Sequence, residues 1–216
     1  MKINQKICRA IYYILGLTIL ALGLTLNAKT GLGVSPITSL PYTVAEILQI
    51  NFGNTVFLSY LIFIAIELAL TKQPSERILI ILQIPLSIVF TRVMNLFGGL
   101  FTLYVETLWQ RMLLLLCAIF CTGVGAALTM NMRLVPNPGD GVVQSISEFS
   151  GQEVGLVKNC VDLINVFCAF LLGCLAGNPL LGVGLGTVIG VFGIGRIVAL
   201  FNKLFKERLQ TQSGLS

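Results

Sequence analysis

SPITSLPYTVAEILQINFG, residues 35–53, is matched by NPGDGVVQSISEFSGQEVG, residues 137–155. Each stretch has a proline in second place, a glutamate ten residues after the proline and a glycine seven residues after the glutamate. In a chain that crosses a membrane, two such segments in corresponding positions of its halves indicate a central binding site. The repeat therefore predicts a duplicated fold and the place of a site, and it leaves the substrate open.

The composition is that of an integral membrane protein. Of the 216 residues, 56% are hydrophobic and 11% are charged, and the mean hydropathy is +0.91. A soluble globule of this size needs a more polar surface than these residues provide. The net charge of +5 comes from basic residues scattered singly beside apolar runs, so we expect the lipid bilayer as partner and no nucleic acid.

Six apolar segments are long enough to cross a bilayer as helices, which rise about 1.5 Å per residue. They are residues 10–28, 54–71, 78–97, 112–130, 154–174 and 179–200. The proline-containing segments, residues 35–50 and 137–151, are too short to span. We therefore expect an all-α polytopic membrane protein with one membrane domain over residues 1–216, repeat one over 10–97 and repeat two over 112–201.

The basic residues predict how this domain is oriented, because cytoplasmic loops are enriched in Lys and Arg. Six crossings that start inside place Lys29, Arg92 and Arg111 outside and eleven basic residues inside, namely Lys2, Lys6, Arg9, Lys72, Arg77, Arg133, Lys158, Arg196, Lys203, Lys206 and Arg208. Counting the two short segments as spans weakens this bias. Both termini are thus expected in the cytoplasm, and three spans per repeat make the repeats inverted.

Each short segment is predicted to begin a helix, because Ser35 and Asn137 are good N-caps and the proline after each suits the first helical position. Residues four apart then share one polar face, which holds Thr38, Tyr42 and Glu46 in the first copy and Asp140, Gln144 and Glu148 in the second. These helices either lie flat at the interface or dip inward as re-entrant half-helices that meet near the midplane. The sequence leaves both arrangements open.

If the half-helices meet, their N-terminal ends would receive an anionic group, and Glu46, Glu148 and Asp140 would bind cations or protons. Asp162 follows Lys158 by four residues, so an intrahelical ion pair is expected, with a proton relay as the alternative. Glu67 lies about one turn from Lys72, and its side chain is expected to reach the membrane interface.

Several classes of chemistry are not expected. The chain has no histidine, and its six cysteines form no metal-ligand motif. The glycine-rich run over residues 182–195 has no preceding strand and no following Lys-Ser/Thr, so it indicates close helix packing rather than a phosphate loop. We therefore expect no catalytic residue, no metal and no cofactor, and the protein is not expected to be an enzyme.

The motifs N-A-K-T-G-L-G-V-S-P-I-T-S-L-P (residues 27–41) and P-N-P-G-D-G (residues 136–141), together with six predicted spans, resemble the YczE/YyaS/YitT family of bacterial integral membrane proteins. The resemblance covers nearly the whole chain. It implies a bacterial cell (inner) membrane, and it supplies neither a substrate nor catalytic residues.

The leading hypothesis is a small-solute transporter or permease. Its predicted substrate or ion site comprises Ser35, Thr38, Tyr42, Glu46, Asn137, Asp140, Gln144, Glu148 and Asp162. The alternative is a non-transporting membrane protein that assists or regulates another complex. A substrate-binding subunit that needs a separate energising module is a third possibility, and a homodimer or a partner membrane protein remains open.

Overall fold

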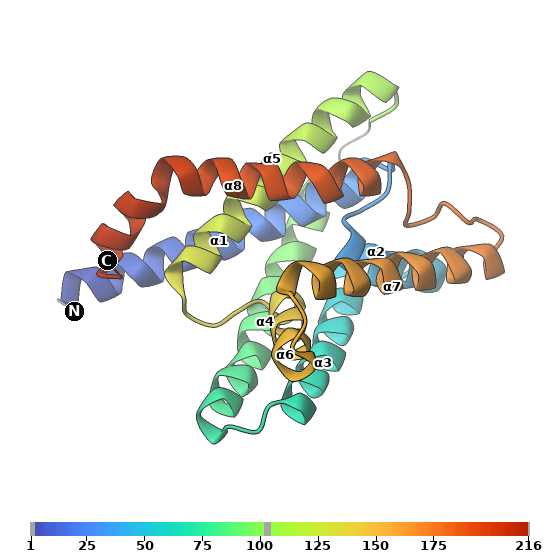
Figure 1. Cartoon of the computed structure of the whole chain (residues 1–216). Helices are drawn as coiled ribbons and strands as arrows, with labels where there is room; N and C mark the ends of the chain where they lie inside the picture. The colour runs from blue at the N-terminus through green and yellow to red at the C-terminus, as the bar shows by residue number, and fades with distance from the viewer. Residues whose placement is uncertain (1–2, 102–104, 216) are drawn as a thin grey trace.

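The structure is a computed structural model that describes residues 3–101 and 105–215, and within these ranges it is all-helical (Figure 1). The helices are α1 (Ile3–Lys29), α2 (Pro36–Leu48), α3 (Phe52–Leu70), α4 (Pro74–Leu100), α5 (Leu108–Met132), α6 (Pro138–Ser150), α7 (Val154–Leu175) and α8 (Leu185–Ser213). The predicted all-α class is confirmed. Lys2, one of the residues in the charge count, lies outside the described residues.

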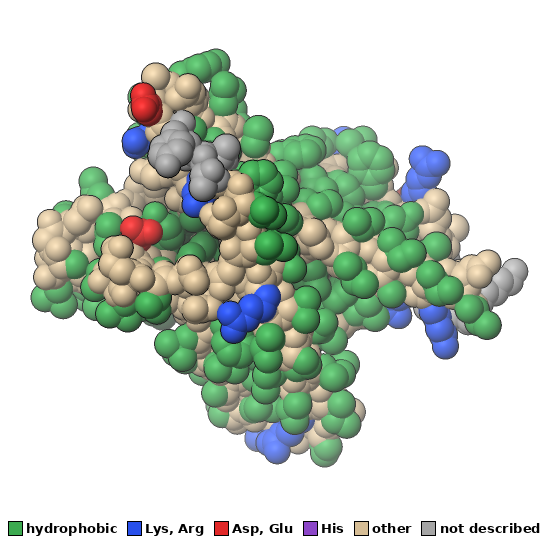
Figure 2. Space-filling model, turned by 180° about the vertical axis from the view of Figure 1, so that it is seen from behind, with side chains coloured by type: hydrophobic (Ala, Val, Ile, Leu, Met, Phe, Trp, Pro, Cys, Tyr) green, Lys and Arg blue, Asp and Glu red, His purple; other side chains and the backbone are tan. Residues whose placement is uncertain are grey.

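Six of these helices are long and apolar enough to cross a membrane: α1, α3, α4, α5, α7 and α8. Each contains an 18-residue window with a mean hydropathy between 1.7 and 2.3. Leucine, isoleucine and phenylalanine side chains are exposed along them, and Figure 2 shows hydrophobic side chains spread over one whole face with scattered charges. Such a surface suits lipid rather than water, so the chain is a multi-pass membrane protein.

The predicted spans and the structure differ mainly at the ends of the helices. The largest difference is in α8, which continues to Ser213, although the predicted span ended at residue 200. Its last part is rich in Lys, Glu, Arg and Leu, which favour a helix but do not belong in hydrocarbon. The hydropathy pattern therefore predicts the part of the helix that suits the membrane, and it does not predict where the helix ends.

The short helices α2 and α6 each have 13 residues, about 20 Å at 1.5 Å per residue, against about 30 Å for a hydrocarbon core. Pro36 and Pro138 begin them, as predicted. Asn137 caps α6, since its side-chain oxygen accepts a hydrogen bond from the Gly139 N–H at 3.0 Å. The chain leaves both helices in the left-handed conformation, at Gln49 and at Gly151.

The antiparallel pair α1 and α5 makes the most extensive helix contact. A methyl group on Gly23 of α1 would meet the backbone nitrogen of Thr122 and come within 2.9 Å of its Cα. A methyl group on Gly125 of α5 would meet the backbone nitrogen of Leu20, 2.7 Å from its Cα. The absent side chains therefore allow the two backbones to touch, as small residues do in membrane helix pairs.

The short helices pack across the molecule rather than only on their neighbours in sequence. α2 lies against α7 and α3, and α6 lies against α3 and α7. Figure 1 shows α6 beside α3 and α7. Because α2 packs against α7 and α6 packs against α3, the starts of both short helices lie inside the bundle, where the candidate site lies.

Candidate functional site

The N-terminal turns of α2 and α6 meet. A methyl group on Gly139 would lie 3.3 Å from Cγ1 of Ile37, so the second residues of the two helices face each other. Glu46 and Glu148 lie ten residues after the respective prolines, about 15 Å further along each helix axis, and both are exposed. The junction therefore brings together the starts of the predicted polar faces and not their glutamates.

On the α2 side, the predicted residues satisfy one another. Ser35 and Thr38 are 4% and 2% exposed, and their hydroxyl oxygens are 2.9 Å apart. The half-buried Tyr42 donates a hydrogen bond from its hydroxyl to the Ala28 carbonyl at 3.5 Å. Burial, reinforced by the neighbouring Glu46 carboxylate, raises the pKa of Tyr42 to about 12. The hydroxyl groups of Ser35, Thr38 and Tyr42 thus have hydrogen-bond partners within the protein, and Tyr42 acts as a neutral hydroxyl.

On the α6 side, a cleft opens between α6 and the end of α5. Its volume is about 380 Å³, in the range of small-molecule sites. It is lined by Thr129, Met130, Arg133, Leu134, Val135, Pro136, Asn137, Asp140 and Gln144. Three predicted site residues, Asn137, Asp140 and Gln144, thus line the cleft, and together with Arg133 they supply one cation, one carboxylate and two amides.

The Asp140 side chain is exposed at this cleft, while the surrounding protein shields its other sides from bulk water. Desolvation by the surrounding protein raises the pKa of its carboxyl, and the positive charge of Lys158 on α7 acts in the opposite direction. One turn further along α6, Gln144 donates a hydrogen bond to Oε1 of Glu148 at 3.0 Å. The polar face therefore runs unbroken from the junction to the exposed end of α6.

The half-buried Asp162 on α7 forms the expected ion pair, with 3.7 Å between its Oδ2 and Nζ of Lys158. Because the lysine side chain is 49% exposed, this pair contributes little to stability. Asp162 does not line the cleft.

Sequence reasoning missed Arg133 as a cleft residue. It ends α5 in the left-handed conformation, with φ at 46°, and is exposed. Arg9 on α1 holds this turn, because its Nε and Nη2 donate to the carbonyl oxygens of Met132 and Arg133 at 2.6 and 2.5 Å. Only the fold brings Arg9 and the end of α5 together, so no local signal could have found this arrangement.

The expectation for Glu67 is wrong. Its side chain is 2% exposed instead of reaching the interface, and its Oε2 accepts a hydrogen bond from Nε2 of Gln83 on α4 at 2.9 Å. Gly141 of α6 makes room for it, since a methyl group there would lie 2.6 Å from Oε2. Ser87, one turn after Gln83, is also 2% exposed. A signal existed, because two polar residues four apart in an apolar span form a buried polar face.

A second, small cavity lies between this buried cluster and the cleft. Its volume is about 10 Å³, and its lining includes Tyr60, Gln83, Ser87 and Asn137. Asn137 also lines the cleft. The small cavity and the cleft thus share Asn137, and the cavity holds Gln83 and Ser87 among mostly apolar side chains such as Leu17, Leu86 and Phe90.

Within the part of the chain that the structure describes, no three His, Cys, Asp or Glu side chains are grouped so as to hold a metal ion.

Fold and site define a multi-pass helical membrane protein with two short helices that meet end to end inside the bundle. The chain belongs to the family described as "Family of unknown function (DUF6198)", whose model matches residues 7–203. This result and the second relative below confirm the resemblance predicted from the sequence.

Two relatives support this membership. A protein of Haemophilus influenzae (strain ATCC 51907 / DSM 11121 / KW20 / Rd), described as uncharacterized, is 30% identical over 188 residues, which cover 86% of this chain and 79% of the relative. The uncharacterized protein YyaS of Bacillus subtilis (strain 168) is 24% identical over 207 residues, covering 94% and 96%. No solved structure matches the chain.

Proposed function

We propose that the protein is a small-solute transporter of the bacterial cell membrane, and that its substrate binds in the cleft beside the junction of α2 and α6. The cleft carries the proposal: about 380 Å³ of space is lined by Arg133, Asp140, Asn137 and Gln144 within a bundle of apolar helices. Ionisable residues inside a membrane domain are expensive and are usually kept for binding or translocation.

Reciprocal contacts support an inverted-repeat core for this transporter. Gly23 touches Thr122, and Gly125 touches Leu20. Because the two repeats are offset by 102 residues, these are the same contact made twice with the partners exchanged, as a twofold axis requires. The packing of α2 on α7 and of α6 on α3 is reciprocal in the same way.

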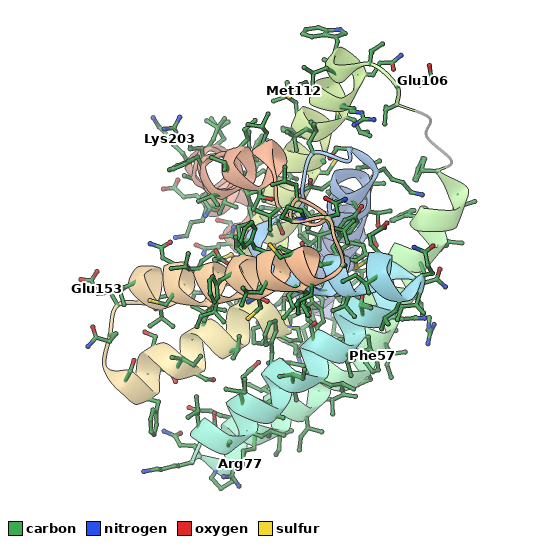
Figure 3. The ribbon with its side chains drawn as sticks, turned by 90° about the vertical axis from the view of Figure 1, so that its right-hand side faces the viewer. Phe57, Arg77, Glu106, Met112, Glu153 and Lys203 are labelled. Carbon is green, nitrogen blue, oxygen red and sulfur yellow. The ribbon has the colours of Figure 1, made fainter. Side chains whose placement is uncertain are left out.

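The positions of the charged ends support the orientation predicted from the sequence. In Figure 3, Glu106, which precedes α5, lies at the upper right, whereas Glu153 lies at the left and Arg77 at the bottom. With cytoplasmic termini, the cleft at the end of α5 then opens to the cytoplasm. The structure would correspond to an inward-open state of an alternating-access transporter.

A two-stage experiment tests this function. The purified protein is first screened for thermal stabilisation by small zwitterions, carboxylates and sugars, since a solute that binds the folded state raises its melting temperature. The stabilising solute is then measured in a counterflow assay with proteoliposomes. Asp140→Asn and Gln144→Ala are each expected to reduce uptake about tenfold, the effect of losing one polar contact of about 1.4 kcal/mol.

Glu76→Gln is the matched control, because Glu76 is an exposed carboxylate in the first turn of α4. It should transport normally. Equal uptake by the Asp140→Asn variant and the control would refute the cleft as the substrate site. If no solute stabilises the protein and one membrane protein copurifies stoichiometrically, the non-transporting alternative replaces the transporter.

A further inference from the structure

A buried polar cluster of Glu67 on α3 and of Gln83 and Ser87 on α4 lies between these two helices. All three side chains are no more than 2% exposed, and only one hydrogen bond links them, from Nε2 of Gln83 to Oε2 of Glu67. Oε1 of Glu67, Oε1 of Gln83 and Oγ of Ser87 have no hydrogen-bond partner among the described residues. Buried polar atoms of native proteins nearly always have partners, so these oxygens are available to accept hydrogen bonds from a bound proton or water.

The surroundings of Glu67 do not compensate a negative charge. α2, α4 and α6 pack against α3, and the groups that reach the carboxylate are the neutral Gln83 of α4 and the backbone at Gly141 of α6. Of the titratable residues on these helices, Asp140 lines the cleft and Tyr42 bonds to the Ala28 carbonyl.

Glu46, Glu76, Arg77, Arg92 and Glu148 are the remaining charged residues of those helices, and all are exposed. Among the described residues, the carboxylate of Glu67 is in no salt bridge. An isolated ionised carboxylate in such a place is strongly disfavoured. A cation that neutralises the group therefore stabilises it, and the proton is the cation that needs no added space.

A route for that proton is present. The cavity of about 10 Å³ beside Gln83 and Ser87 is just large enough for one water molecule. Asn137 lines both this cavity and the cleft of about 380 Å³. Asn137 and the small cavity thus lie between water in the cleft and Gln83, which is the hydrogen-bond partner of Glu67.

We propose that Glu67 is a reversible proton-binding site that exchanges its proton with water in the cleft through the cavity beside Asn137. A proton transferred from water to the carboxylate forms a neutral carboxylic acid, and release to water reverses the step with no other bond made or broken. The inference deepens the proposed function, on which it rests for its purpose: this proton would be the coupling ion of the transporter.

Infrared difference spectroscopy of the protein in liposomes tests the site without any solute. The wild-type protein is expected to show a carbonyl band of a protonated carboxylic acid that vanishes at alkaline pH and shifts in heavy water. The Glu67→Gln variant should lack this band, and the Glu76→Gln control should retain it. An unchanged band in the Glu67→Gln variant would overturn the proposal, and so would loss of the wild-type band on adding sodium at constant pH.

A second variant keeps the carboxylate and blocks its route. Ser87→Val places an additional methyl group at the small cavity, which should displace the water. The band is expected to persist while its exchange in heavy water slows about tenfold, equivalent to a barrier about 1.4 kcal/mol higher. Unchanged exchange would contradict the route. Because neither measurement involves transport, a failed uptake assay and a failed proton site are distinguished.

Discussion

The contact between α1 and α5 offers a sharp test of the architecture through Gly125→Ala. The new methyl carbon would lie 2.7 Å from Cα of Leu20 and 2.8 Å from the carbonyl oxygen of Gly16. Ordinary contacts of such carbons begin near 3.4 Å, and the backbone nitrogen of Leu20 is closer still than its Cα, so the helices must separate by at least about 0.7 Å. Backbone atoms cannot rotate away, and the cost therefore falls on the whole helix pair.

The size of this effect follows from two opposing terms. Overpacking in a well-packed interior costs about 1–3 kcal/mol, and replacing glycine by alanine in a helix returns up to about 1 kcal/mol. A net loss of about 1–2 kcal/mol lowers the melting temperature by about 3–6 °C for a chain of this size. Gly23→Ala should cause a similar loss, because it inserts the equivalent methyl group at the backbone of Thr122.

The assay is thermal unfolding in one detergent at one scan rate, followed by circular dichroism. Gly155→Ala is the control, since no atom lies within 4 Å of a methyl group there. The control should be as stable as the wild type or more stable by up to about 1 kcal/mol. If Gly125→Ala unfolds together with the control, the close approach of α1 and α5 is refuted.

Three further predictions use the same unfolding assay. Arg9→Lys loses the two-pronged contact with the carbonyl groups at the end of α5 and should unfold earlier, by about 1 kcal/mol; an unchanged midpoint would show that Arg9 does not hold this turn. Asp140→Asn should unfold later than the wild type at neutral pH, because desolvation raises the pKa of Asp140 in the folded state and its ionised form opposes folding. This gain should vanish below the ordinary pKa of 3.8 and grow as the pH rises above it, so a gain independent of pH would count against the reasoning. Gly141→Ala must displace the carboxylate of Glu67 and should unfold before the Gly155→Ala control; equal midpoints would mean that Glu67 does not face α6.

The membrane class, the six spans and the two short helices could be predicted because they depend on local properties. Apolar runs of sufficient length indicate spans, and Pro36 and Pro138 indicate helix starts. Helix ends were less well predicted, as the extension of α8 to Ser213 illustrates. Local sequence also correctly predicted the ion pair between Lys158 and Asp162.

The site itself could be predicted only in part. Spacing placed Asp140 and Gln144 on one face of a helix, and the structure shows that this face lines a cleft. The spacing of Gln83 and Ser87 indicated a buried polar face on α4, but it did not indicate that Glu67 packs against this face, because Glu67 belongs to another helix. The nearby Lys72 suggested a snorkelling side chain, whereas packing against α6 determined the outcome. Roles that depend on contacts between distant segments require the fold.

The central claim, that α2 and α6 meet at their N-terminal turns, is tested most directly by disulfide cross-linking. In a variant whose six native cysteines are replaced by alanine, Ile37→Cys and Gly139→Cys are introduced together. The 3.3 Å between Cγ1 of Ile37 and a methyl group on Gly139 lets the sulfur atoms reach bonding distance. Copper-catalysed oxidation in native membranes should join this pair rapidly, while a pair at Glu46 and Glu148 stays reduced. Cross-linking of the outer pair, or none between positions 37 and 139, would contradict the account.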